Sequence, residues 1–466
     1  MPSHFTRHLY VHVFVALLAL CCPRAIFAGP PTPNQPILIV QNSASSDPYQ
    51  YFVPELLTTE GLNGFQTAQL SDLTASFLSN YDVVILPHFA LTAAQVTLFQ
   101  NFVNAGGNLI GFRPDQQLAS VFGVSPQGTT LSEAWLKIDT TTQYGVALAA
   151  QVMRFHGTAD NYSVSTAKSV ATLYSSVTAP TAFPAATVNT YGMGQAVLFA
   201  FDLTQSLTLI RQGNPAWAGY PNSHDGYSTM RASQMFMDRG SGQFWNDLGD
   251  GTLNDVPQAD EELRLFSNAL TLTNTAKRPL PRLWYFPNQA RALILMTGDH
   301  HGDASSNSSS EINAVQSAGG LFQEYLWYPY GAISSATVQG WQSAGHSFGV
   351  HFDDTGQTDF SGVGGAAVSW SGMQSVMTTA LGALTSAFPT VQNPPGTNRN
   401  HYLIWVSNNS SGAADQTANA KLLQNFGIGM DETFSAFPNR WGYMSGSGLP
   451  MKFLDTTTGS EFTVAS

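Results

Sequence analysis

Short apolar runs alternate with amphipathic stretches over residues 37–112, and this pattern limits the possible folds more than any other feature of the chain. The runs are ILIVQ at 37–41, YDVVILPHF at 81–89 and NLIGF at 108–112. Strands that are covered on both faces are apolar in this continuous way. The stretch between the last two runs places Val96, Phe99 and Val103 at helical spacing. Strand–helix–strand alternation with short loops predicts an α/β fold with a parallel, doubly wound sheet.

The chain is too long for one ordinary core, because 466 residues correspond to two or three domains of usual size. QAVLFAFDL at 195–203 indicates a late strand of the first sheet, and the Thr-, Ala- and Val-rich residues 130–190 indicate a β-rich insertion. We therefore place a first domain at 36–275. Three prolines between 276 and 289 are typical of a linker, and we place a second domain at 286–466.

The N-terminus has the features of an export signal. Residues 9–22, LYVHVFVALLALCC, form an apolar run that is preceded by a basic residue and followed by the small residue Ala28. We predict that residues 1–28 are a cleaved signal peptide and that the mature protein is secreted, extracellular or associated with a cell wall. An uncleaved N-terminal anchor is the alternative.

The composition of the mature chain excludes several classes of protein. Both cysteines, Cys21 and Cys22, lie in the predicted signal peptide, so no disulfide and no cysteine nucleophile remain. Lys and Arg number 18 against 30 Asp and Glu, which excludes the basic surface that nucleic acids or anionic lipids require. No second apolar run is long enough for a membrane span, and we expect none in the mature chain.

Polar residues follow an apolar run at the start of the second domain. Ala292–Met296 is predicted to be a buried strand, and Thr297, Asp299, His300 and His301 come directly after it. Active sites of barrels and open α/β sheets form at the carboxyl ends of the strands. We therefore expect functional side chains at this point of the chain.

A second polar segment, AGHSFGVHFDD at 344–354, contains His346 and His351. Residues five apart lie on opposite faces of a straight strand, so we expect a bend near Gly349 that brings the two imidazoles together. Five histidines lie between positions 300 and 401. Clustered histidines beside a carboxylate are typical of a divalent metal site, most often Zn²⁺ where no thiol is present. We predict such a site at Asp299, His346 and His351.

The order of these motifs resembles the polysaccharide deacetylase (NodB-homology) superfamily. Thr297-Gly-Asp-His corresponds to its Thr-Phe-Asp-Asp motif, and His346-Ser-Phe-Gly-Val-His351 to its His-Ser/Thr-x-x-x-His motif. The two-domain arrangement is most similar to secreted galactosaminogalactan deacetylase-type proteins, carbohydrate esterase family 18. The resemblance implies a distorted (β/α) barrel of the NodB type over 286–466. It implies an enzyme that hydrolyses the N-acetyl groups of an N-acetyl-hexosamine polysaccharide and releases acetate.

The resemblance also implies a metal-ligand set. His346 and His351 occupy the positions of the family's two ligand histidines, and His300 stands where the family has a metal-binding Asp. A third imidazole is a suitable zinc ligand, so His300 is expected to bind directly. His301 or Asp299 is the alternative third ligand.

Catalytic roles follow from the same resemblance. Asp299 takes the position of the catalytic base, and Arg399 that of the arginine that orients it. No histidine follows His401, so His401 is expected to act as the general acid, unless the acid lies beyond Ser466 in a chain that is truncated at its C-terminus. Asp353-Asp354 stands after the histidine pair instead of before it, and we interpret it as a loop carboxylate pair near the site.

The first domain resembles the class I glutamine-amidotransferase-like, flavodoxin-like fold. The residues concerned are Tyr81-Asp-Val-Val-Ile-Leu-Pro and Phe102-Val-Asn-Ala-Gly-Gly-Asn-Leu-Ile. That chemistry needs a cysteine, which the mature chain lacks, so we expect a scaffold or a glycan-contacting module. A second function from a different class stays open: a non-catalytic, glycan-binding cell-surface protein on a deacetylase-like scaffold.

Overall fold

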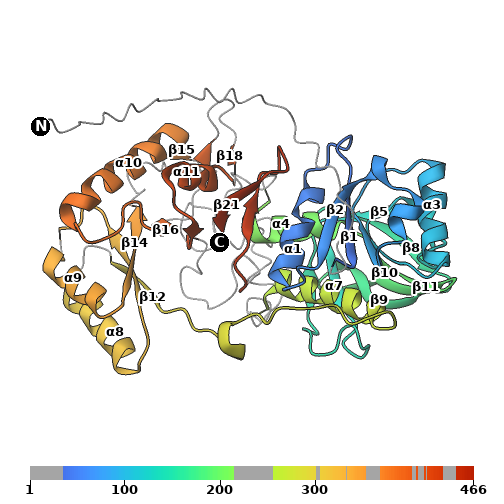
Figure 1. Cartoon of the computed structure of the whole chain (residues 1–466), viewed down its shortest axis with the longest axis horizontal. Helices are drawn as coiled ribbons and strands as arrows, with labels where there is room; N and C mark the ends of the chain where they lie inside the picture. Colours follow the sequence, from blue (N-terminus) through green and yellow to red (C-terminus); the bar gives the residue numbers. More distant parts are fainter. Residues whose placement is uncertain are drawn as a thin grey trace, which may run out of the picture.

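The computed structural model of the whole chain describes residues 35–214, 256–300, 305–331, 333–352, 368–400, 406–407, 414–415, 417–433 and 448–465. The predicted signal peptide, His301, His401 and the Asp353-Asp354 pair lie outside these residues. Two large sheets lie side by side along the long axis of the molecule (Figure 1).

The first sheet combines a parallel and an antiparallel part, in the strand order β2-β1-β3-β4-β11-β10-β9-β6-β7 within the described residues. The first five strands of this order pair in parallel, and the remaining pairs are antiparallel. A separate antiparallel pair, β5 with β8, belongs to the same region. The strands are β1 (Ile37–Gln41), β2 (Phe65–Gln69), β3 (Val83–Leu86), β4 (Asn108–Phe112), β5 (Val124–Ser132), β6 (Trp135–Ile138), β7 (Val152–Arg154), β8 (Thr158–Val164), β9 (Lys168–Ser176), β10 (Ala179–Tyr191) and β11 (Gly194–Phe199).

Both faces of the parallel part are buried, which explains why its strands are apolar throughout. Ile37 and Ile39 of β1 belong to one core, and the alternate residues Leu38 and Val40 belong to another. Helices cover both faces and form a three-layer α/β arrangement. They are α1 (Val53–Thr59), α4 (Leu203–Gln212) and α7 (Gln258–Asn274) over one core, and α2 (Ala75–Leu78) and α3 (Ala93–Asn104) over the other. The predicted α/β fold with a parallel sheet is confirmed.

The second sheet is parallel except at one end. Its order is β12-β13-β14-β16-β19-β21-β20 within the described residues, and only β20 runs antiparallel to its neighbour. The parallel strands therefore follow the order of the chain, so each connection advances in the same direction across the sheet. The strands are β12 (Thr297–His300), β13 (Gln323–Trp327), β14 (Ser347–Phe352), β16 (Thr397–Asn400), β19 (Met430–Asp431), β20 (Lys452–Leu454) and β21 (Glu461–Ala465).

Helices pack on one face of this second sheet. Leu326, Val350 and Phe352 share a core with residues of these helices. Three short strands, β15 (Val368–Ser369), β17 (Val406–Ser407) and β18 (Ala414–Asp415), form a small additional sheet. The helices are α8 (Ser305–Ser317), α9 (Ser335–Ser343), α10 (Trp370–Ala387) and α11 (Ala418–Phe426).

The predicted buried strand Ala292–Met296 is wrong. Strand β12 begins only at Thr297, and Leu293, Ile294, Leu295 and Met296 are 55%, 79%, 67% and 41% exposed. β12 forms the end of its sheet, and within the described residues the run before it has no neighbouring strand and no covering helix. The hydrogen bond from Gln323 N to Met296 O links the end of this run to β13.

The two sheets are joined by the hairpin β20–β21. Leu454 of β20 exchanges two hydrogen bonds with the side chain of Gln212 in α4, at 3.0 and 2.8 Å. Lys452 N donates to Glu55 Oε1 of α1 at 2.9 Å, and Arg211 donates to Leu449 O at 2.8 Å. Figure 1 shows this hairpin between the sheets, next to α4 and α1.

No helix in the described part of the chain is long and apolar enough to cross a membrane.

Candidate functional site

The two faces of the second sheet have different chemistry, and strand register decides which residues share a face. Asp299 pairs with Tyr325, and Tyr325 pairs with Gly349. Two residues further along these strands, Trp327 pairs with His351, and His351 pairs with Arg399. In a parallel sheet, paired residues and residues two apart point to the same side. These residues therefore lie on the face opposite the helix-covered core, near the carboxyl ends of the strands.

Asp299 is the centre of this polar face. Its Oδ2 lies 3.1 Å from Arg399 Nε, and 3.9 Å from Nε2 of the buried His351. The Trp327 ring stacks on the His351 imidazole with centroids 4.9 Å apart and planes tilted by 30°. The structure thus brings together Asp299, His351 and Arg399 from three strands. An ion pair with a guanidinium stabilises a carboxylate in its charged, proton-accepting form.

A buried tyrosine and a second acid complete the cluster. Burial raises the pKa of the Tyr325 hydroxyl, and the adjacent Glu432 carboxyl raises it further. Burial also raises the pKa of Glu432, against the charge of Arg399, which lowers it. The charge of Asp299 acts in the opposite direction from that of Arg399 and raises the pKa of Glu432. Sequence reasoning did not single out Tyr325 or Glu432. Tyr325 lies within β13 and Glu432 directly follows β19. Their place beside Asp299 depends on which strands are neighbours, and the sequence alone does not show this.

The expected convergence of His346 and His351 does not occur. Strand β14 keeps continuous register with β13 from Ser347 to His351, without a bulge. His346 precedes the first residue of the strand and His351 stands near its last, about 17 Å further along at roughly 3.3 Å per residue. The His346 ring accepts the Phe322 N–H at 3.0 Å and lies 3.5 Å from Gln316.

Gly349 serves a purpose other than the predicted bend. A Cβ atom at this position would lie 2.5 Å from the ring of Tyr325 and 2.6 Å from Thr397 Oγ1. The missing side chain therefore leaves room for the Tyr325 ring on the polar face. His351 reaches Asp299 because both residues occupy strand ends on that face.

His300 lies on the other face of the sheet. It follows Asp299 directly in β12 and pairs with the core residue Leu326, and its side chain is 3% exposed. The helix-covered face also holds Glu324, which accepts a hydrogen bond from Ser308 of α8 at 2.8 Å. Burial raises the pKa of Glu324 to about 7, and the nearby Glu311 and Asp299 charges act in the same direction. In this geometry His300 lies on the opposite face from His351, and its role as a metal ligand stays a prediction.

The described residues do not bring the predicted histidine ligands together, and the zinc site stays a prediction. His300, His346 and His351 occupy different faces or ends of the sheet. Among the residues that the structure describes, no three His, Cys, Asp or Glu side chains are placed to hold a metal ion. The alternative ligand His301 and the predicted general acid His401 lie outside these residues. What the described residues provide is an Asp–His–Arg cluster suited to accepting and moving protons.

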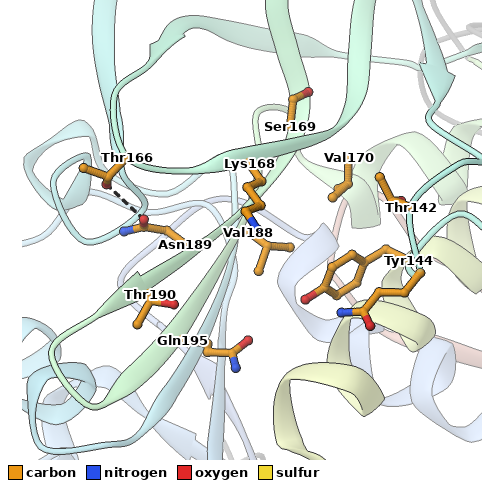
Figure 2. A pocket seen from close by; sticks show the side chains of 11 residues that line it. Thr142, Tyr144, Thr166, Lys168, Ser169, Val170, Val188, Asn189, Thr190 and Gln195 are labelled. Atoms are coloured by element: carbon orange, nitrogen blue, oxygen red, sulfur yellow. Dashed lines mark hydrogen bonds between the residues drawn. The ribbon is translucent and has the colours of Figure 1, made fainter.

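A separate groove of about 530 Å³ lies on the first sheet, far along the chain from Asp299. Figure 2 shows Tyr144, Lys168, Val188, Thr190 and Gln195 around this hollow, with Thr166 hydrogen-bonded to Asn189 at 2.9 Å. Lys168 is the one charged side chain that lines it, and the other polar linings are hydroxyl and amide groups. Its volume lies within the range of small-molecule sites.

Comparisons with known proteins define no family for this chain. No family model and no curated protein sequence matches it. Among solved structures, a β-galactosidase from Bacillus circulans sp. alkalophilus aligns with a TM-score of 0.29 and 14% identity over 37% of this chain and 30% of that one. A putative ThuA-like protein from Bacteroides uniformis aligns with a TM-score of 0.28 and 14% identity over 38% of this chain and 85% of that one.

An exo-β-1,4-mannosidase from Opitutaceae bacterium strain TAV5 aligns with a TM-score of 0.28 and 12% identity over 38% of this chain and 32% of that one. This chain therefore spans about a third of the length of the two glycoside hydrolases. Similarity at this level establishes neither fold nor activity.

Proposed function

We propose that this chain is a secreted hydrolase that removes N-acetyl groups from an amino-sugar polysaccharide and releases acetate. The observation that carries the proposal is the placement of Asp299 at the carboxyl edge of a parallel sheet, 3.1 Å from Arg399 and 3.9 Å from His351. This is where catalytic side chains gather in barrels and open α/β sheets. The motif resemblance supplies the substrate class.

The sequential parallel order of the second sheet supports a finer proposal for its architecture. We propose a distorted (β/α) barrel of the NodB type over 286–466, beside an amidotransferase-like domain over 36–275. A barrel of this kind has helices outside and its active site at the carboxyl ends of the strands, and Asp299 lies near such an end, on the face opposite the helices.

In the proposed reaction, Asp299 acts on the water nucleophile. The carboxylate accepts a proton from the water while the water oxygen attacks the acetamide carbonyl carbon. Arg399 holds the carboxylate in place and charged. The carbon–nitrogen bond then breaks, the departing amine takes up a proton, and acetate and an amino sugar result. The proton that Asp299 took from the water is thereby returned to the amine, and His351, whose Nε2 lies 3.9 Å from Asp299 Oδ2, is placed to relay it. His401 keeps the general-acid role that the resemblance implies, as a proposal.

The first test measures acetate release from N-acetyl-hexosamine polymers by the wild type and by Asp299→Asn. We expect the variant to lose about 10²- to 10⁴-fold in kcat/KM, the usual contribution of a positioned base. Asp139→Asn is the matched control, because Asp139 is an exposed carboxylate that bonds only to its own turn. A folded wild type that releases no acetate from any such polymer would overturn the proposal. A chelator arm, with and without added Zn²⁺, tests metal dependence separately.

The groove on the first sheet favours a second candidate function, a glycan-binding protein without catalysis. Hydroxyl and amide groups beside the Tyr144 ring match the hydroxyls and apolar faces of neutral sugars. In this case Tyr144→Ala and Lys168→Ala each weaken polysaccharide binding in isothermal titration calorimetry, whereas Lys137→Ala, an exposed lysine of β6, does not. Binding without acetate release would favour this second function, and acetate release lost in Asp299→Asn would favour the first.

A further inference from the structure

The floor of the groove on the first sheet is one face of strands β9, β10 and β11. Lys168 of β9 pairs with Val188 of β10, and Thr190 of β10 pairs with Gln195 of β11. Paired residues, and residues two apart on one strand, point to the same side of a sheet. Lys168 therefore shares this face with Val188, Thr190, Gln195 and the buried Val170. The floor thus combines an apolar centre with polar groups around it.

The loop at residues 139–145 forms one wall of the groove and is tied down by hydrogen bonds. Asp139 Oδ1 accepts the N–H of Thr141 at 3.0 Å and its hydroxyl at 2.6 Å. Thr142 Oγ1 donates to Asp139 O at 2.9 Å. The backbone carbonyl of Tyr144 accepts the Asn268 amide of α7 at 3.0 Å. The Tyr144 ring is therefore in position before a ligand arrives, which lowers the entropy cost of binding.

The other side of the groove in Figure 2 is formed by Thr166 and Asn189. The Thr166 hydroxyl donates to Asn189 Oδ1 at 2.9 Å, and Asn189 Nδ2 donates to Val121 O at 2.8 Å. Asn189 is 4% exposed, so its amide is held in a buried network. Both sides of the groove are thus preformed from hydroxyl, amide and aromatic groups, as in small-molecule sites.

The charge of the groove is one-sided. Lys168 is the one charged side chain among the described lining residues, and no carboxylate lines the groove among them. The amino end of Lys168 lies beside Val188 in Figure 2. Asp139, in the neighbouring loop, directs Oδ1 to Thr141 and is outside the lining. A cationic ligand would therefore bring a second positive charge next to Lys168 with no lining carboxylate to compensate, whereas a neutral ligand would not.

We propose that this groove is a charge-selective subsite that holds N-acetylated, uncharged segments of the polysaccharide and rejects segments with free amino groups. Lys168 is the residue that determines this selectivity. The inference rests on the proposed function, because deacetylation converts a neutral acetamide into an amine that takes up a proton. Segments that still carry acetyl groups stay bound, and segments that have lost them are released.

Calorimetric titration of the full chain tests the selectivity. The probes are hexamers of N-acetylglucosamine and of N-acetylgalactosamine, and the same hexamers without acetyl groups. Asp299→Asn is the starting protein, so that the proposed reaction does not consume the probe. The titration is made at about pH 5, where a primary amine is protonated, and at about 0.15 M salt, where distant charges are screened. We expect at least one acetylated hexamer to bind roughly three- to tenfold more tightly than its cationic counterpart.

A charge series at one position separates selectivity from general affinity. Lys168→Gln should abolish the preference, and Lys168→Glu should reverse it, because a carboxylate attracts the ammonium groups. Lys168 is exposed, so these variants should fold, which circular dichroism checks. Lys137→Glu is the matched control: it changes the net charge equally, at an exposed lysine of β6 outside the lining, and should keep the preference.

Equal affinities for the acetylated and cationic hexamers would overturn the proposal, as would a preference that survives in Lys168→Glu. So would the absence of binding by both acetylated hexamers. Tighter binding of a galacturonate hexamer than of the acetylated probes would show an anion site and would also overturn it.

Acetate release by the wild type is measured separately from binding. Selective binding without acetate release would overturn the proposed hydrolase and leave the subsite standing. Acetate release with equal affinities for the two kinds of hexamer would overturn the subsite and leave the hydrolase standing. The two proposals therefore fail in different experiments.

Discussion

At the residue scale, the alternation of side chains along a strand decides which chemistry can assemble. Asp299 and His300 are neighbours in the chain, yet one lies beside Arg399 and the other pairs with the core residue Leu326. His346 stands just before β14 and His351 lies near its end, five positions further along a straight strand, so the two rings do not converge. A bend in β14 would let this five-residue spacing bring the two imidazoles together. The straight strand keeps them apart.

Substitution of Gly349 tests this view of the polar face. Gly349→Ala places a Cβ 2.5 Å from the Tyr325 ring, so the ring or β14 must move. We expect a loss of about 1–3 kcal/mol in unfolding free energy, the usual cost of overpacking. Urea denaturation measures it. Gly340→Ala in α9, where a Cβ meets nothing within 4 Å, is the control and should be neutral or stabilising. Equal effects of the two substitutions would contradict the packing argument.

At the scale of the element, similar apolar runs have different outcomes because their surroundings differ. Residues 37–41 form a strand between β2 and β3, with cores on both sides. Residues 293–296 are equally apolar but stay exposed before an end strand. The ends of a helix depend mainly on residues close by in the sequence. Thr92 caps the N-terminus of α3 with a capping box, and Gly106 follows its C-terminus with a φ of +104°.

The capping box of α3 gives a prediction at this scale. Thr92→Ala removes the acceptor for Gln95 N and should lower the unfolding free energy by about 1 kcal/mol. Thr97→Ala is the control, since Thr97 is an exposed threonine inside the same helix, where alanine is at least as favourable. Thermal unfolding followed by circular dichroism compares the two. A Thr97 variant less stable than the Thr92 variant would show that the cap contributes little.

At the scale of the whole molecule, contacts over very long sequence distances join the two sheets. Glu55 and Lys452 are 397 positions apart and share a hydrogen bond, and Gln212 holds both backbone groups of Leu454. Residues near the C-terminus, assigned by sequence to the second domain, thus also pack on helices of the first region. The domain boundaries at 275 and 286 stay predictions.

Removal of the Gln212 amide tests how strongly the hairpin is held. Gln212→Ala leaves the buried N–H and C=O of Leu454 without partners, and each costs about 1–3 kcal/mol. We expect a clear fall in melting temperature and separate unfolding transitions for the two regions in calorimetry. Lys452→Ala, which removes half-exposed ion pairs with Glu55 and Glu461, should change stability by less than about 1 kcal/mol. A single unchanged transition in the Gln212 variant would contradict this role of the hairpin.

Much of the first sheet and part of the site were predictable from the sequence. ILIVQ, VVIL and NLIGF are strands in the structure because continuous β-branched runs need cover on both faces and the intervening helices provide it. Asp299 and Arg399 meet as expected. The straightness of β14 and the contributions of Tyr325 and Glu432 were not predictable, since they depend on which strands become neighbours.

The sequence by itself determined the alternation of strands and helices in the first sheet and the placement of Asp299 near the end of a strand, although not the bounds of that strand. These properties depend on local periodicity and residue type, which need no partner to be read. Only the tertiary structure decided that His300 and His346 lie away from His351 and that Gln212 holds Leu454. Such outcomes arise from register and from contacts between distant segments, because a side chain's neighbours are set by the strands and helices that pack against it.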